Sequence, residues 1–119
     1  MNNLKERTKR FALDCWFFSK KIPNSREYNA YVNQLIRCSS SVGANYRASQ
    51  RGKSTADFIN KLKIVEEEVD ESMYFLELFI EIMDQNIDEA KKLHADANEL
   101  LSIIVASINT ARKNSNSNQ

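Results

Sequence analysis

Apolar residues recur at alternating spacings of three and four along four segments of this chain, and glycine and proline are almost absent. Such spacing places the apolar side chains on one stripe of an α-helix, as in the seam of a helical bundle. With two glycines and one proline in 119 residues, the sequence lacks the turn residues that many short strands would need. We therefore predict a single all-α domain with one hydrophobic core.

Four helices are predicted, at about residues 3–21, 26–50, 55–84 and 88–112. Ser25 is placed to cap the second helix, and Ser54 with Asp57 resembles a capping box at the start of the third. The short connections favour an antiparallel up-down four-helix bundle that spans residues 1–113. Residues 114–119 are all Asn, Ser or Gln, and we predict that they form a disordered polar tail.

The second predicted helix has an apolar face and a cationic face on opposite sides. Its apolar face carries Leu35, Ser39, Val42 and Tyr46, and its cationic face carries Arg26, Arg37, Arg47 and Arg51. Gly43 lies between the two faces, where glycine costs about 1 kcal/mol of helix stability relative to alanine. We therefore expect the backbone at Gly43 to approach a neighbouring helix closely.

The basic residues are concentrated in the first half of the chain. Residues 1–63 carry thirteen Lys or Arg and four acids, a balance of +9, whereas residues 64–119 carry four basic and twelve acidic residues, a balance of −8. Such asymmetry is typical of nucleic-acid binding. Alternatively, the two halves neutralise each other as packed helices or across subunits. The predicted nucleic-acid surface comprises Arg26, Arg37, Arg47, Arg51, Lys53 and Lys9.

The third predicted helix has a second apolar stripe in addition to its bundle seam. Phe75, Leu78 and Ile82 lie opposite the seam, flanked by Tyr74 and Phe79. A helix in a monomeric bundle buries one stripe, so this second stripe indicates either a wide seam or self-association. We favour self-association and predict an oligomer interface at Phe75, Leu78 and Ile82.

The sequence indicates no catalytic, cofactor or metal site, and we expect a protein that is not an enzyme. His94 is the only histidine, and no Glu stands three residues before it, as a di-iron bundle would require. Glu68 and Glu71 can instead reach Asn45 or an arginine of the second helix. Trp16 and Phe17 lie off the main seam, and we expect them to serve packing or an interface rather than to form a base-stacking platform.

Cys15 and Cys38 lie within helical patterns, which favours buried free thiols in a reducing compartment over a disulfide. No apolar stretch approaches the roughly 20 residues that a membrane-spanning helix needs, and no leader pattern opens the chain. We therefore expect a soluble cytoplasmic protein with no membrane partner.

Three segments resemble a known bacterial family. Residues 34–45 read QLIRCSSSVGAN, residues 57–62 read DFINKL, and residues 67–76 read EEVDESMYFL. These segments resemble, in order and spacing, the four-helix-bundle proteins encoded in intervening sequences of 23S ribosomal RNA genes, a family that includes the accessory variability determinant of diversity-generating retroelements. Many members continue Asn-Ile-x-Glu, whereas this chain has Arg47 followed by Ala48, so its second helix is more basic.

The resemblance implies a homopentameric ring without known catalytic activity. In the retroelement members, a basic surface of the ring engages nucleic acid and a reverse transcriptase. For this chain we accordingly expect a non-enzymatic accessory or scaffold protein that associates with itself. We expect it to bind RNA or DNA through its first two helices and to assist a reverse transcriptase or other nucleic-acid enzyme. The alternative is a protein-binding adaptor ring with no role in nucleic-acid binding.

Overall fold

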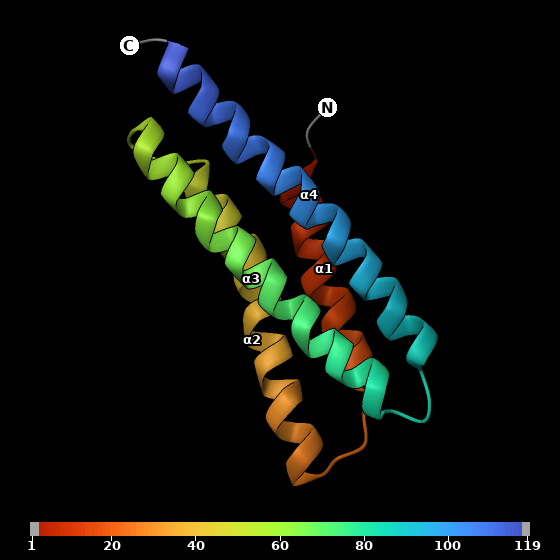
Figure 1. Ribbon diagram of the computed structural model, residues 1–119. Helices are drawn as coiled ribbons and strands as arrows, with labels where there is room; N and C mark the ends of the chain where they lie inside the picture. The colour runs from red at the N-terminus through yellow and green to blue at the C-terminus, as the bar shows by residue number, and fades with distance from the viewer. Residues whose placement is uncertain (1–2, 118–119) are drawn as a thin grey trace.

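The computed structural model describes residues 3–117 and contains four α-helices, with no strand among those residues (Figure 1). The helices are α1 (Leu4–Ser19), α2 (Arg26–Ser49), α3 (Thr55–Ile82) and α4 (Ile87–Ser117). Consecutive helices run in opposite directions, so the chain forms an elongated bundle of 54 × 22 × 21 Å. The predicted all-α class and the four helices are confirmed.

Each helix packs against its neighbours in the chain, and α1 closes the arrangement against α4. The diagonal pairs, α1 with α3 and α2 with α4, do not approach each other closely. With 16 residues, α1 is the shortest helix, and its contact with α4 is the least extensive of the four. The outer sides of α1 and α3 therefore lie on opposite sides of the bundle.

The core consists of the stripes that the apolar spacing predicts. On α1, Leu4, Phe11, Cys15 and Phe18 are buried together with Thr8. The stripes of the other helices are buried too, and they include Leu35, Val42 and Tyr46 on α2, Leu62, Val65, Val69 and Leu76 on α3, and Ala90, Leu93, Ala97, Leu100, Ile104 and Ile108 on α4. The apolar spacing therefore predicts the buried stripe of each helix, with one exception on α3.

Serine hydroxyls cap α2 and α3 as expected. The Ser25 hydroxyl accepts a hydrogen bond from the Tyr28 backbone N–H at 3.1 Å, and the Ser54 hydroxyl accepts one from the Asp57 N–H at 3.1 Å. The Asp57 carboxylate accepts from the backbone N–H of Lys53 rather than from that of Ser54. The capping box is therefore displaced by one residue, while the helix still begins at the predicted place.

The last helix extends beyond its expected end. It continues through Ser117 instead of ending near residue 112, so the structure differs from the predicted disordered tail over residues 114–117, and residues 118–119 lie outside the described part of the chain. Once a helix is nucleated, each added residue gains one backbone hydrogen bond without needing an apolar contact. Polar residues can therefore prolong α4 beyond the core.

One aromatic residue of α3 lies on a different side than expected. Phe79, predicted to flank the second apolar stripe, is completely buried in the core. It contacts the ring of Phe18 at a centroid distance of 5.8 Å and that of Tyr28 at 6.5 Å. Since α3 packs against both α2 and α4, its buried face is wider than a single seam. The wide-seam alternative is therefore correct for Phe79.

The helices α1 and α2 cross closely at Gly43, as the sequence indicates. A Cβ atom placed on Gly43 would lie 3.3 Å from Thr8 Oγ1 and 3.5 Å from the Thr8 carbonyl carbon. Thr8 cannot easily move, because it is completely buried and its hydroxyl donates a 2.7 Å hydrogen bond to the Leu4 carbonyl. A Cβ atom at residue 43 would therefore already be tightly packed, and a larger side chain would force the two helices apart.

Gly43→Leu should lower the free energy of unfolding by about 1–3 kcal/mol, because added carbons in a packed contact displace side chains or backbone. The better helix propensity of leucine offsets less than about 1 kcal/mol of this loss. Ala44→Leu, at the next, exposed position, is the matched control and should change stability by less than about 0.5 kcal/mol. Urea unfolding followed by circular dichroism measures both, and equal stabilities would contradict the close crossing.

Candidate nucleic-acid interface

Four cationic side chains line a groove between α1 and α2. Lys5 and Lys9 project from α1, Arg47 projects from the last turns of α2, and Arg51 follows directly after that helix. Beside Lys9 the α2 side of the lining consists of small residues, Ser40, Gly43 and Ala44, and toward Arg51 it continues with Tyr46 and Gln50. The groove exists because the helices meet through Gly43 and Thr8, which leaves no bulky side chain above the contact.

The groove is electropositive. Among the residues that the structure describes, none of its four cations makes an ion pair, and Glu6 is the only carboxylate that lines it. The sequence explains this, because no acid occurs between Glu27 and Asp57. Asp14, the other acid of α1, faces the opposite groove toward α4 and pairs with Arg10 at 3.0 Å. Three of the predicted residues, Lys9, Arg47 and Arg51, are thus brought together with Lys5.

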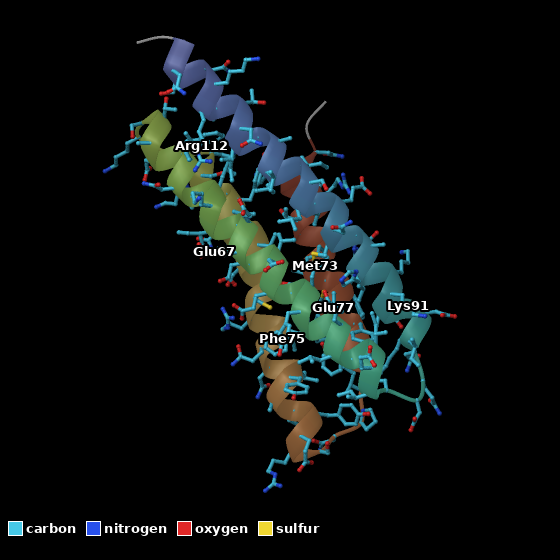
Figure 2. All side chains as sticks on the ribbon, viewed as in Figure 1. Glu67, Met73, Phe75, Glu77, Lys91 and Arg112 are labelled. Carbon is cyan, nitrogen blue, oxygen red and sulfur yellow. The ribbon has the colours of Figure 1, made fainter. Side chains whose placement is uncertain are left out.

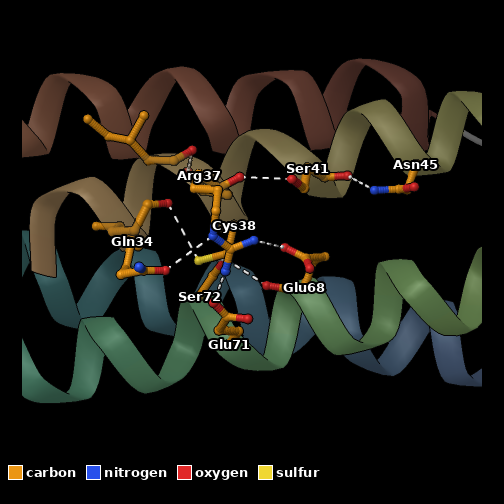
Figure 3. Close-up of polar contacts among 11 residues, drawn as sticks. Gln34, Arg37, Cys38, Ser41, Asn45, Glu68, Glu71 and Ser72 are labelled. Atoms are coloured by element: carbon orange, nitrogen blue, oxygen red, sulfur yellow. Dashed lines mark hydrogen bonds and ion pairs between the residues drawn. The ribbon is translucent and has the colours of Figure 1, made fainter.

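Arg37 does not share this face. Its Nη1 lies 3.3 Å from Glu68 Oε2 on α3, and its Nη2 forms a second ion pair with Glu71. Its Nε also donates to the side-chain oxygen of Gln34 at 3.1 Å (Figure 3). The prediction that Glu68 and Glu71 reach an arginine of the second helix is therefore correct, whereas Asn45 bonds to the Ser41 carbonyl instead.

The predicted single ridge of arginines is therefore divided. Arg37 and Arg47 are ten residues apart, which places them about 80° apart around the helix. Since α1 and α3 flank α2 on either side, this angle is enough to send Arg37 toward α3 and Arg47 toward α1. A guanidinium on a long side chain then binds whichever carboxylates it can reach.

Arg26 and Lys53 lie away from the groove. Arg26 opens α2, twenty-one residues before Arg47 and thus roughly 32 Å away along the helix. It is highly exposed and pairs with the adjacent Glu27 at 3.0 Å. The side chain of Lys53 is exposed in the connection between α2 and α3, and its backbone N–H donates to Asp57. Neither residue lines the groove, although both lie on helix α2 or close to its end.

Several contacts neutralise the two halves of the chain within the fold. Arg7 pairs with Glu99 of α4 at 3.0 Å, and Lys21 pairs with Glu89 at 2.8 Å. With Arg37, three basic residues of the first half are thus matched by acids of the second. Neutralisation within the fold is therefore correct for these three residues, and the groove cations have no such partner among the described residues of the chain.

The second apolar stripe of α3 is only partly covered. Phe75 and Leu78 are half-buried, whereas Ile82, at the end of α3, is 46% exposed. Phe75 lies on the side of α3 that meets α2 (Figure 2). Its ring centroid is 6.0 Å from that of Tyr31 on α2. The stripe thus begins at the contact with α2 and ends at the exposed Ile82, while Tyr74, which is 55% exposed, adjoins Phe75 at its other end.

An apolar patch lies on the outer side of α1. Leu13, Trp16 and Phe17 are 39%, 45% and 49% exposed. Trp16 and Phe17 therefore lie off the core, as the sequence indicates, and of the two expected roles an interface stays a prediction. The signal was present in the sequence, since all three residues fall opposite the stripe of Leu4, Phe11 and Cys15.

Both cysteines are free and buried at helix contacts. Burial raises the pKa of the Cys15 thiol and, to a lesser degree, that of the Cys38 thiol. The Ser72 hydroxyl approaches the Cys38 sulfur at 3.3 Å and donates to the Glu68 carbonyl, which links α2 to α3 beside Arg37 (Figure 3). This environment disfavours the thiolate, so neither cysteine is a poised nucleophile.

Other sites are not evident in residues 3–117. That part of the chain has no group of three or more His, Cys, Asp or Glu side chains arranged to hold a metal ion. His94 instead faces Glu77, with 2.9 Å between Nε2 and Oε2. None of the described helices combines the length and apolar character needed to cross a bilayer.

Comparisons with known proteins identify a family and solved structures of similar fold. The model of the family described as 23S rRNA-intervening sequence protein matches residues 2–106. A protein of unknown function from the S23 ribosomal protein family of Bacteroides thetaiotaomicron is 30% identical, with a TM-score of 0.80 over 87% of this chain and 96% of the other. A comparison with curated proteins finds no match.

Both thiols should react slowly with a thiol reagent in the native protein and at the ordinary rate in concentrated guanidinium chloride, because burial blocks access and raises each pKa. The raised pKa values also make stability depend on pH. Below pH ~8.5 the thiols are protonated in both the folded and the unfolded chain, and the free energy of unfolding is highest with respect to these groups. Above that pH the unfolded thiols ionise first, so the free energy of unfolding decreases. Labelling with a chromogenic disulfide measures the rates, and fast native labelling of Cys15 would contradict its burial.

Proposed function

The chain belongs to the family of 23S rRNA-intervening sequence proteins, and from that premise we propose that it is a non-enzymatic, oligomeric accessory or scaffold protein that binds nucleic acid. Membership confirms the resemblance seen in three sequence segments. The observation that carries the proposal is the groove between α1 and α2, where Lys5, Lys9, Arg47 and Arg51 converge without ion-pair partners among the described residues.

The groove suits a phosphate backbone. Arginine guanidinium groups bind phosphate oxygens in a bidentate manner, and lysine ammonium groups add point charges. The Ser40 hydroxyl, which lines the groove, is a further neutral donor. Gln50 is the one side-chain amide among the described residues that line the groove, so they form no array that would distinguish bases. The proposed binding is therefore independent of sequence and decreases steeply with salt, because each phosphate contact releases counterions.

Self-association would multiply this binding. We propose a homo-oligomer, a pentameric ring as the family resemblance implies, in which Phe75, Leu78 and Ile82 contribute to the contact between subunits. The exposure of Ile82 and Tyr74 supports this assignment. A ring repeats the groove once per subunit, and linked weak sites gain affinity through effective concentration. The proposed setting is the cytoplasm, where the ring would assist a reverse transcriptase or another nucleic-acid enzyme.

The second candidate function is that of an adaptor ring that binds an acidic protein. It is favoured by one observation, the engagement of Arg37 by the carboxylates of Glu68 and Glu71. That contact demonstrates how a surface arginine of α2 can bind glutamates of another helix. In an adaptor, Arg47 and Arg51 would bind a partner's carboxylates in the same way.

Exchanging groove cations should weaken binding of a labelled DNA or RNA and flatten its salt dependence. Arg47→Gln and Lys9→Gln should each reduce the slope of log K against log salt by about 0.7–0.9, the loss of one phosphate contact. Fluorescence anisotropy across a salt series measures both effects. Absence of binding at low salt would contradict the proposed function and leave the adaptor.

Two arginines of α2 serve as controls in this experiment. Arg26→Gln removes an exposed charge roughly 32 Å from Arg47 and should leave the salt slope unchanged. Arg37→Gln removes a charge that two glutamates already neutralise, so its effect should be smaller than that of Arg47→Gln. Equal losses from all three exchanges would indicate a diffuse charge effect instead of a site in the groove.

The oligomer should have a mass well above that of the 13.7 kDa chain. Ile82→Glu should dissociate it, because a charge buried between subunits without a partner is costly. Ile64→Glu is the matched control, since Ile64 is 40% exposed on the same helix, about 27 Å from Ile82. Light scattering on a sizing column measures the mass, and a monomeric native protein would contradict the ring.

A further inference from the structure

Trp16 lies on the same face of α1 as the groove lysines, beyond the end of the groove. Lys5, Lys9 and Ala12 line the groove on the α1 side, and Trp16 and Lys20 follow at intervals of four residues. Residues at intervals of three and four share one face of a helix, so these five side chains form a single row. The row is roughly 22 Å long at 1.5 Å per residue. An exposed aromatic ring therefore stands in line with three lysines.

The indole of Trp16 is held in place although it is not buried. It remains 45% exposed, while the ring of Phe17 lies nearly perpendicular to it at a centroid distance of 5.1 Å. The Lys20 ammonium lies 5.1 Å from the centre of the Trp16 ring, in a cation–π contact. These two neighbours contact the ring and leave nearly half of the residue's surface exposed. A flat, partly exposed and oriented ring next to cations is the kind of surface on which a nucleic-acid base stacks.

We infer that the groove between α1 and α2 binds single-stranded nucleic acid, with Lys5, Lys9, Arg47 and Arg51 on the phosphates and Trp16 stacked on a base. This inference rests on the proposed function and adds the class of nucleic acid. A duplex keeps its bases stacked on one another and offers the groove phosphates alone, so it would leave Trp16 unused. A single strand can turn one base onto the indole while its backbone follows the cations.

The charge around Trp16 favours a polyanion over a second copy of the chain. Lys9 and Lys20 lie on either side of Trp16 along the row, and neither makes an ion pair among the described residues. The carboxylates of α1 are directed elsewhere, since Glu6 and Asp14 line the groove toward α4, although Glu6 also borders the cationic groove. On the α2 side, residues 28–56 contain no acid.

The chain offers a direct probe, because Trp16 is its only tryptophan. Titration of the native protein with oligothymidylate, and in parallel with oligouridylate, should quench the tryptophan fluorescence to saturation. A duplex of equal length should bind at low salt without comparable quenching. Comparing the thymidylate and uridylate arms shows whether the strand is DNA or RNA.

Variants separate stacking from charge. Trp16→Ala should weaken binding of a labelled single strand by about 5- to 100-fold, whereas Trp16→Phe should retain most of the affinity. The salt slope should be unchanged in Trp16→Ala, because no phosphate contact is lost, but reduced in Arg47→Gln. Ile64→Ala removes an exposed apolar side chain from α3 and should have no effect.

These measurements distinguish failure of the single-strand inference from failure of the proposed nucleic-acid binding. Salt-dependent binding that is equally tight for duplex and single strand, with no quenching and no effect of Trp16→Ala, would overturn the inference and keep the proposed function. Absence of any binding at low salt would overturn both. Tryptophan emission that changes on dilution of the protein alone would place Trp16 at a subunit contact and likewise overturn the inference.

Discussion

The close crossing of α1 and α2 at Gly43 and Thr8 determines where the cationic side chains of the first half can meet. Because Gly43 has no side chain and Thr8 is held by its bond to the Leu4 carbonyl, the two backbones approach within van der Waals contact. The outer edges of both helices are thereby brought together, with lysines from one and arginines from the other. A bulkier residue at this crossing would widen the bundle and separate the cations on which the proposed function depends.

The charge asymmetry of the chain has two different consequences in the fold. Where basic helices meet acidic ones, Arg7, Lys21 and Arg37 are matched by carboxylates of the second half. Where the two basic helices meet each other, no carboxylate other than that of Glu6 is available, and the positive charge remains. Surface ion pairs contribute little to stability, so the pairs mainly decide which cations can bind a ligand.

The fold could be predicted from the sequence almost completely, and the candidate site only in part. Periodicity, Ser25 and Ser54 as caps, and Gly43 as a close contact all agree with the structure. Phe79 was assigned to the wrong side because α3 packs against two neighbours and buries a wider face than one seam. The position of Trp16 off the seam was predicted, but a helical projection cannot distinguish an outer face that packs on another subunit from one that meets solvent.

By itself, the sequence determined four amphipathic helices, their order, their caps and the excess of basic residues in the first two, since these depend on local spacing and composition. Only the tertiary structure decided which cations remain unpaired. Arg37 and Arg47 lie on one cationic side of an isolated helix, but α3 brings two glutamates to the first and α1 brings two lysines to the second. The charges near a side chain depend on which helix packs beside it. The periodicity of one helix does not specify that neighbouring helix.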